Sequence, residues 1–143
     1  MTAQAHRRIA LQCALVGMHF RPPARQVLAR LRVGTLLELI REPENPYDPA
    51  AVQVWVAPSA LPEELWQDPG WEEELAQAGS GVEDLWAQER LQLGYLGQSP
   101  KLIEPGQTPG AKVAERMDAG ERVEAKLTCS LSGKPSVGVR VEG

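Results

Sequence analysis

Apolar and polar residues alternate along most of the chain in short runs. Apolar side chains at every second position are typical of β-strands that bury one face. Glycine and proline residues separate these runs and mark the turns between them. The alternation predicts six strands, at Ile9 to Met18, Thr35 to Ile40, Ala51 to Ala57, Leu91 to Gly97, Glu121 to Leu131 and Ser136 to Val141.

Two stretches have helical spacing instead. Apolar side chains from Val27 to Leu31 share one face of a helix that we expect to begin at Pro22–Pro23 and to end at Gly34. Proline is tolerated in a first turn, and glycine is a common stop. A second helix is expected over Pro109 to Ala119, with Gly120 as its stop. Six strands and two short helices predict a mainly β fold, a six-stranded barrel similar to an oligonucleotide-binding (OB) fold.

Residues 58–90 break the alternation. They hold Trp66, Trp71 and Trp86 and nine acidic residues against one basic, a net charge of −8, while the rest of the chain carries +4. Short helical turns are expected at residues 62–67, 71–78 and 82–88. We interpret this acidic segment, residues 58–90, as a helical insertion between two strands of a single domain that spans residues 1–143. A solvated appendage docked on the barrel is the commonest explanation for such a segment, and a surface for a protein partner or a nucleic-acid mimic remains open.

Composition restricts the class of protein. A net charge of −4 and a pI near 5.2 argue against a general polyanion binder. Cys13 and Cys129 lie on the apolar side of two predicted strands without a CxxC motif, so we expect buried thiols rather than a disulfide or metal ligands. No apolar run approaches the ~20 residues of a membrane span. We therefore expect a cytoplasmic protein that binds no membrane, no metal ion and no cofactor.

A rigid polar loop joins two predicted strands between Arg41 and Val54. Prolines at positions 43, 46 and 49 fix the backbone there. Asn45, Tyr47 and Asp48 offer an amide, an aromatic ring with a hydroxyl, and a carboxylate, a set that suits a ligand with a flat face and a hydroxyl. The same residues are typical of a capped turn that bonds its own backbone. The loop alone leaves both interpretations open.

A second candidate group directly follows the first predicted strand. His19, Phe20 and Arg21 place an aromatic ring and two potential cations beside a strand end, where they could contact phosphate and stack on a base. Alternatively, Phe20 is a core residue and Arg21 is solvated.

Three runs resemble the HIRAN family in order and spacing. They are LVGMHF at residues 15–20, REPENPYDPAAVQV at residues 41–54 and LGYL at residues 93–96. The Asn-Pro-Tyr-Asp segment followed by an Ala-Val strand is the most specific part. The family occurs at the front of eukaryotic fork-remodelling helicase-like ATPases and as small free-standing bacterial and phage proteins. The resemblance covers nearly the whole chain except the acidic segment.

The resemblance implies an OB-like barrel that binds single-stranded DNA at its free 3′-hydroxyl end, in DNA repair or replication-fork processing. At the matching positions, Phe20 and Tyr47 would stack on the terminal bases, and Asp48 would accept a hydrogen bond from the 3′ hydroxyl. Asn45 would hold the loop or the end nucleotide. A carboxylate beside a stacking ring distinguishes a free hydroxyl from a phosphodiester. The remaining residues of the implied interface are His19, Arg21, Tyr95 and Lys134.

The chain also departs from the family pattern. His19 stands where DNA-binding members have an arginine, Gln98 stands near a family lysine, and the turn at residues 132–136 has no aromatic residue, so we expect a lower affinity. Glu42, Glu44 and Asp48 could hold a divalent ion, although neighbouring carboxylates on a turn are usually solvated.

The sequence has no nucleotide-binding GxxxxGK[ST], zinc ligand set or Ser/His/Asp arrangement, so we expect a non-catalytic module. The alternative function is a protein-interaction module in which the acidic segment binds a partner and the barrel is its scaffold.

Overall fold

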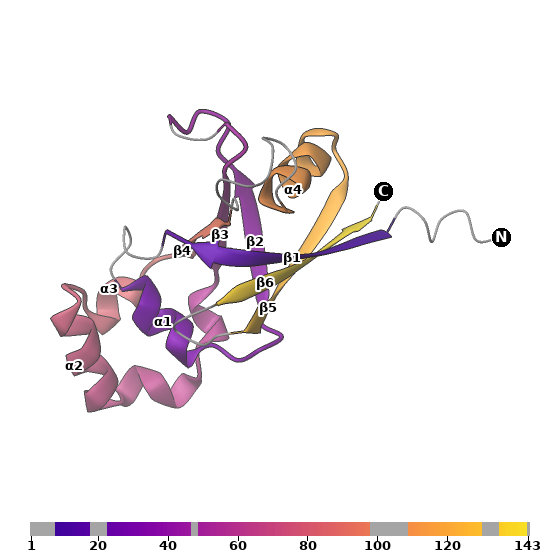
Figure 1. Ribbon diagram of the computed structural model, residues 1–143. Helices are drawn as coiled ribbons and strands as arrows, with labels where there is room; N and C mark the ends of the chain where they lie inside the picture. The colour runs from indigo at the N-terminus through magenta and orange to yellow at the C-terminus, as the bar shows by residue number, and fades with distance from the viewer. Residues whose placement is uncertain (1–7, 18–22, 47–48, 98–108, 130–134, 143) are drawn as a thin grey trace.

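The computed structural model describes residues 8–17, 23–46, 49–97, 109–129 and 135–142. Within these residues, six antiparallel strands form a closed barrel in the order β1-β4-β3-β2-β5-β6 (Figure 1). The prediction of a mainly β, OB-like six-stranded barrel is confirmed. The strands are β1 (Arg8–Val16), β2 (Leu36–Arg41), β3 (Val52–Val56), β4 (Leu91–Leu96), β5 (Arg122–Cys129) and β6 (Ser136–Glu142).

Alternation along each strand places one row of side chains inside the barrel. In β3, Val52, Val54 and Val56 are buried, whereas Gln53 and Trp55 lie half-buried on the other face, as expected. Each fully buried valine stabilises the fold by roughly 1.5–3 kcal/mol relative to an exposed one. The outer face of β3 is therefore free to carry polar chemistry.

Two helices pack on the barrel outside the acidic segment. Helix α4 (Pro109–Asp118) follows the prediction, and Gly120 ends it with a positive φ. Helix α1 (Ala24–Arg30) begins as expected but ends before Gly34. The reason is that Leu31 is extended and buried, and Gly34 donates its backbone N–H to the Leu127 carbonyl of β5 instead.

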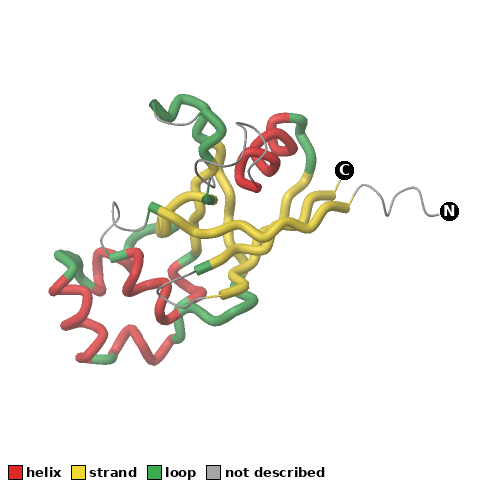
Figure 2. Tube along the Cα trace, in the orientation of Figure 1, coloured by secondary structure: helices red, strands yellow, loops and turns green. Residues whose placement is uncertain are grey.

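The acidic segment folds into four short helical elements between β3 and β4: η3 (Pro58–Ala60), η4 (Glu63–Gln67), α2 (Pro69–Gln77) and α3 (Val82–Trp86). Figure 2 shows them gathered at one end of the molecule, beside α1. Trp71 and Leu75 are completely buried, and Arg30 of α1 lies 5.7 Å from the Trp71 ring and 3.0 Å from Glu74. The segment is therefore docked through core residues as well as through an ion pair.

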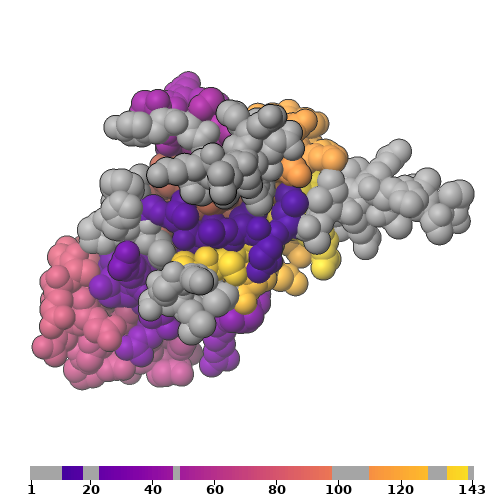
Figure 3. Space-filling view, in the orientation of Figure 1, coloured from indigo at the N-terminus to yellow at the C-terminus, as the bar shows by residue number. Residues whose placement is uncertain are grey.

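The acidic segment and the loop between β2 and β3 lie at opposite ends of β3. The chain enters β3 at Val52 from the loop and leaves at Val56 toward η3. Figure 3 shows the same separation, with the loop at the top of the molecule and the acidic segment forming a lobe at the lower left. Charges on the segment are thus remote from the loop.

The described residues also bear on the remaining sequence expectations. Cys13 is buried with a free thiol, as predicted, and burial raises the pKa of this thiol to about 11. The side chain of Cys129 lies outside the described residues. None of the described helices has the length and apolar character needed to cross a membrane.

Candidate nucleic-acid interface

Arg41 fixes both sides of the loop between β2 and β3. Its guanidinium donates to the Ala51 carbonyl at 2.7 Å and to the Pro49 carbonyl at 2.9 Å. It also forms a two-point contact with Asp118 at the end of α4, at 2.9 and 3.1 Å. A bidentate arginine–carboxylate pair is geometrically strict, so the loop is tied to the helix as well as to the barrel.

The pairing with Arg41 also acts on the Asp118 carboxyl. The hydrogen bond from Arg41, together with its positive charge, lowers the pKa of Asp118 below its ordinary value. The pair therefore contributes to stability above the ordinary aspartate pKa, and this contribution is lost as the pH falls through the lowered one.

The Glu42 carboxylate joins the loop to the outer face of the barrel. It accepts hydrogen bonds from the Asn45 amide of the loop, from Gln53 Nε2 of β3 at 2.7 Å and from the Tyr95 hydroxyl of β4 at 3.0 Å. Gln53 in turn accepts from Trp55 Nε1 at 2.8 Å. We call these five residues the Glu42 network. Hydrogen bonds to a charged group are stronger than those between neutral groups, so the network holds the short polar loop in a fixed position on the barrel.

Gly94 sets the position of Tyr95 within this network. A side chain on Gly94 would place its Cβ 2.2 Å from the Val16 carbonyl oxygen, and the pairing of β3 with β4 shifts register beside it, between Val54 and Trp55. Gly94 thus lies at a close approach between β4 and β1 and beside an irregularity in the pairing of β3 with β4. Beyond it, Tyr95 pairs with Gln53 on one side and with Val16 on the other.

Two of the predicted site residues lie within the described part of the chain. Asn45 and Tyr95 meet at the Glu42 carboxylate, although they come from a loop and from a strand about fifty positions later. The others lie outside the described residues: His19, Phe20, Arg21, Tyr47, Asp48 and Lys134.

The described residues that flank those positions are close neighbours in the barrel. Val16, at the end of β1, pairs with Tyr95. The Pro135 carbonyl, before β6, accepts from the Leu15 N–H at 3.0 Å. Val16 and Pro135, which lie close to two of the ranges outside the described residues, are therefore both at the same end of β1.

Sequence reasoning did not identify the residues that hold the loop. Glu42 was expected to be a solvated carboxylate, and this is wrong because three side chains donate to it. The polar Gln53 on an apolar strand was a visible signal. The contact of Asp118 with the loop gave no signal in the sequence, because Asp118 lies 77 positions from Arg41. Within the described residues, no group of three or more histidine, cysteine or acidic side chains could hold a metal ion.

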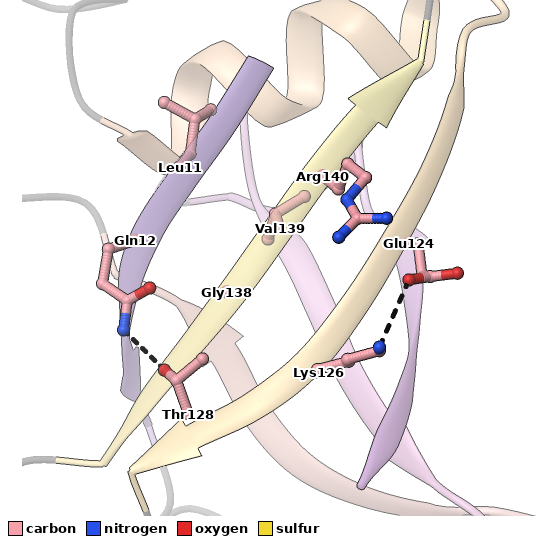
Figure 4. A pocket seen from close by; sticks show the side chains of 8 residues that line it. All are labelled: Leu11, Gln12, Glu124, Lys126, Thr128, Gly138, Val139 and Arg140. Carbon is pink, nitrogen blue, oxygen red and sulfur yellow. Dashed lines mark hydrogen bonds and ion pairs between the residues drawn. The ribbon is translucent and has the colours of Figure 1, made fainter. Parts of the chain in front are cut away.

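A hollow of about 290 Å³, lined by both apolar and polar residues, lies on the outer face of β1, β6 and β5 (Figure 4). Gly138 leaves room for it, because a Cβ there would lie 2.8 Å from the Thr128 methyl group. Gln12 donates to Thr128 across the hollow, and Lys126 lies 3.8 Å from Glu124 at its side. The Gln12 amide and the Thr128 hydroxyl are groups that can contact a phosphodiester, whereas the Lys126 ammonium already faces the Glu124 carboxylate.

Comparison with known proteins supports the fold assignment. No family model matches the chain, and no curated protein matches it. Among solved structures, a Lactobacillus plantarum protein determined by a structural genomics consortium is 20% identical, with a TM-score of 0.55 over 95% of this chain and 99% of that one. The HIRAN domain of human HLTF is 14% identical, with a TM-score of 0.50 over 95% of this chain and 79% of that one. The chain therefore has a HIRAN-like fold.

Proposed function

We propose that this chain is a non-catalytic module that uses its HIRAN-like fold to bind single-stranded nucleic acid, with the free 3′-hydroxyl end of DNA as its ligand. DNA repair or replication-fork processing is the setting that this ligand implies. The Glu42 network carries the proposal, because it orders a polar loop against Tyr95 where a barrel of this type can present it to a ligand.

Recognition of the 3′ end is assigned to the loop residues between Pro46 and Pro49. The Tyr47 ring would stack on the terminal base, and such stacking contributes about 1 to 3 kcal/mol per base. Asp48 would accept a hydrogen bond from the 3′ hydroxyl and would repel a 3′ phosphate. Phe20 would stack on the next base. An anchored loop lowers the cost of ordering these groups when the ligand binds.

The chain offers further groups for the phosphodiester backbone. His19, Arg21 and Lys134 are the proposed contacts, and Gln12, Thr128 and Arg140 add polar groups at the hollow beside Gly138. Outside the acidic segment the chain carries a net charge of +4, which favours a polyanion.

A fluorescence anisotropy titration tests the proposal. A 5′-labelled ten-nucleotide DNA with a free 3′ hydroxyl is compared with the same strand carrying a 3′ phosphate. We expect the hydroxyl strand to bind about tenfold more tightly, an effect of roughly 1.4 kcal/mol. Tyr47→Ala is expected to weaken binding of the hydroxyl strand by a similar factor or more. Equal affinity for the two ends would contradict 3′-end recognition, and absence of binding to both would contradict the nucleic-acid function.

A further inference from the structure

Two tryptophans line a groove on the surface of the acidic segment, which follows β3, whereas the loop that holds Asn45 precedes it. The Trp66 and Trp86 rings meet edge to face with their centroids 4.7 Å apart. The hollow beside them has a volume of about 440 Å³, and Val82 and Ala87 form part of its wall. Glu63 and Glu83 lie at the same hollow. We call these six residues the tryptophan groove.

Trp86 is not needed to anchor its helix. The side chain of Trp86 is 58% exposed, whereas Leu85 beside it is buried and holds α3 against the core. The same segment buries Trp71 completely, so it has the means to bury an indole where the fold requires one. Large exposed aromatic rings beside a hollow are typical of surfaces that bind a partner.

The charges at the groove select the kind of partner. Among the described residues, no cation pairs with Glu63 or Glu83, while Arg30 and Arg90 are engaged with Glu74 and Glu38. The acidic segment as a whole carries −8. Nucleic acid would be repelled here, whereas a segment that combines arginine or lysine with an apolar side chain would satisfy both the carboxylates and the indoles.

We propose that the tryptophan groove is a docking site for a basic segment of a partner protein that carries apolar side chains. An apolar side chain of this segment packs against Trp66 and Trp86, and its flanking cations meet Glu63 and Glu83. The proposal does not depend on DNA binding, because the groove belongs to the segment that follows β3, whereas Glu42 and Asn45 lie in the loop that precedes β3. One chain could thus bind a DNA end and a protein together.

Three short peptides test this docking site on the full chain at physiological salt. The probe is the labelled peptide RLLRRLLR, and the matched controls replace its leucines with glycine (RGGRRGGR) or its arginines with glutamate (ELLEELLE). We expect RLLRRLLR to bind and each control to bind at least about tenfold more weakly, because the groove requires both charge and an apolar anchor. If RGGRRGGR bound as tightly as RLLRRLLR, binding would depend on charge alone and the proposal would be wrong. Absence of RLLRRLLR binding would also overturn it.

Variants locate the binding. Trp86→Ala removes a mostly exposed ring and its edge contact with Trp66, so the chain should stay folded with a slightly lower thermal stability while losing about tenfold in RLLRRLLR affinity. Val33→Ala is the matched control, because Val33 is a large apolar residue 62% exposed elsewhere on the surface. If both variants bound the peptide like the parent, the site assignment would be wrong.

Sedimentation of the parent and of Trp86→Ala identifies the occupant. We expect both to be monomeric without peptide. A parent dimer that Trp86→Ala dissociates would show that the groove binds a second copy of this chain, and this would overturn the partner assignment. Affinity for the DNA strand is measured on the same samples, so failure of the groove can be told apart from failure of the nucleic-acid function.

Discussion

Glu42 is the residue on which the order of the loop depends. Its carboxylate accepts from Asn45, Gln53 and Tyr95, and each of these donors comes from a different place along the chain. A carboxylate provides only acceptors, so three donors can converge on it without conflict. The network therefore requires a charged group at this position rather than only a polar one.

Glu42→Gln should weaken the loop because its amide NH₂ would face a side-chain donor. A half-buried donor left without a partner costs about 1–3 kcal/mol. We expect the free energy of unfolding to fall by about 1–2 kcal/mol in chemical denaturation and DNA affinity to fall by about threefold or more. Glu44→Gln, two positions away and exposed, is the matched control and should change neither. If the two variants behaved alike, the loop would not depend on Glu42.

Asp48 is expected to control selectivity for the end of the strand and to leave binding of internal nucleotides unchanged. In the proposed site only this carboxylate repels a 3′ phosphate, so Asp48→Ala should bind the 3′-hydroxyl and 3′-phosphate strands equally. Competition titrations with both strands measure the ratio directly. If the ratio of the two affinities stayed at the parent value, a residue other than Asp48 would recognise the 3′ end.

At the scale of elements, β4 carries Tyr95 to the interface through a close approach to β1. Gly94→Ala would drive a Cβ into the Val16 carbonyl, and a backbone atom cannot move aside as a flexible side chain can. We expect a loss of stability on the order of 3 kcal/mol, with disruption of the β1–β4 pairing. Thermal unfolding checks the first effect and amide hydrogen exchange at Tyr95 the second. Gly79→Ala is the control, because Gly79 also has a positive φ but has open space where a Cβ would lie. This substitution should lower the stability by less than Gly94→Ala does. An equal loss at both positions would rule out the close approach as the cause.

The acidic segment is part of the core and not a removable appendage. Leu61, Leu65, Trp71, Leu75 and Leu85 belong to the same apolar cluster as the barrel valines. Its influence on DNA binding is therefore better tested by removing charge than by deleting chain. Four acidic residues of the segment already have a role: Glu74 pairs with Arg30, Asp68 caps α2, and Glu63 and Glu83 lie at the tryptophan groove. The other five are exposed: Glu64, Glu72, Glu73, Asp84 and Glu89.

Changing these five residues to their amides should leave DNA affinity unchanged at physiological salt. The five residues of β3 separate the segment from the loop by roughly 16 Å, about twice the ~8 Å Debye length. Anisotropy titrations at low and physiological salt measure the effect. Tighter binding that persisted at physiological salt would indicate that the acidic segment lies near the bound strand.

For the molecule as a whole, the alternation of apolar and polar residues predicted the six strands of the barrel. The six strands follow it closely because a residue on a pleated strand must face either core or solvent. Helix α1 departs at Leu31, where burial of one side chain in an extended conformation outweighs helical spacing. Glycine at position 34 then forms a turn against β5 instead of ending the helix.

The candidate site was only partly visible in the sequence. The proline loop stood out by its composition and by its resemblance to a family, and Tyr95 stood out by the resemblance alone. The contacts of Arg41 with Asp118 and of Glu42 with Tyr95 did not, because barrel closure and the docking of α4 bring together residues that are distant along the chain. Local patterns identify side chains, but the closed topology determines which of them meet.

In the function proposed for this chain, the loop anchored by Glu42 receives the 3′ end of a single strand. The most direct test is NMR mapping of the isotope-labelled chain during titration with a short DNA strand that has a free 3′ hydroxyl. We expect the largest shifts at the Asn45 side-chain amide, the loop backbone and the Tyr95 amide, with the Trp86 indole unchanged. Shifts centred on Trp86, or shifts that spare Asn45 and Tyr95, would contradict the proposal.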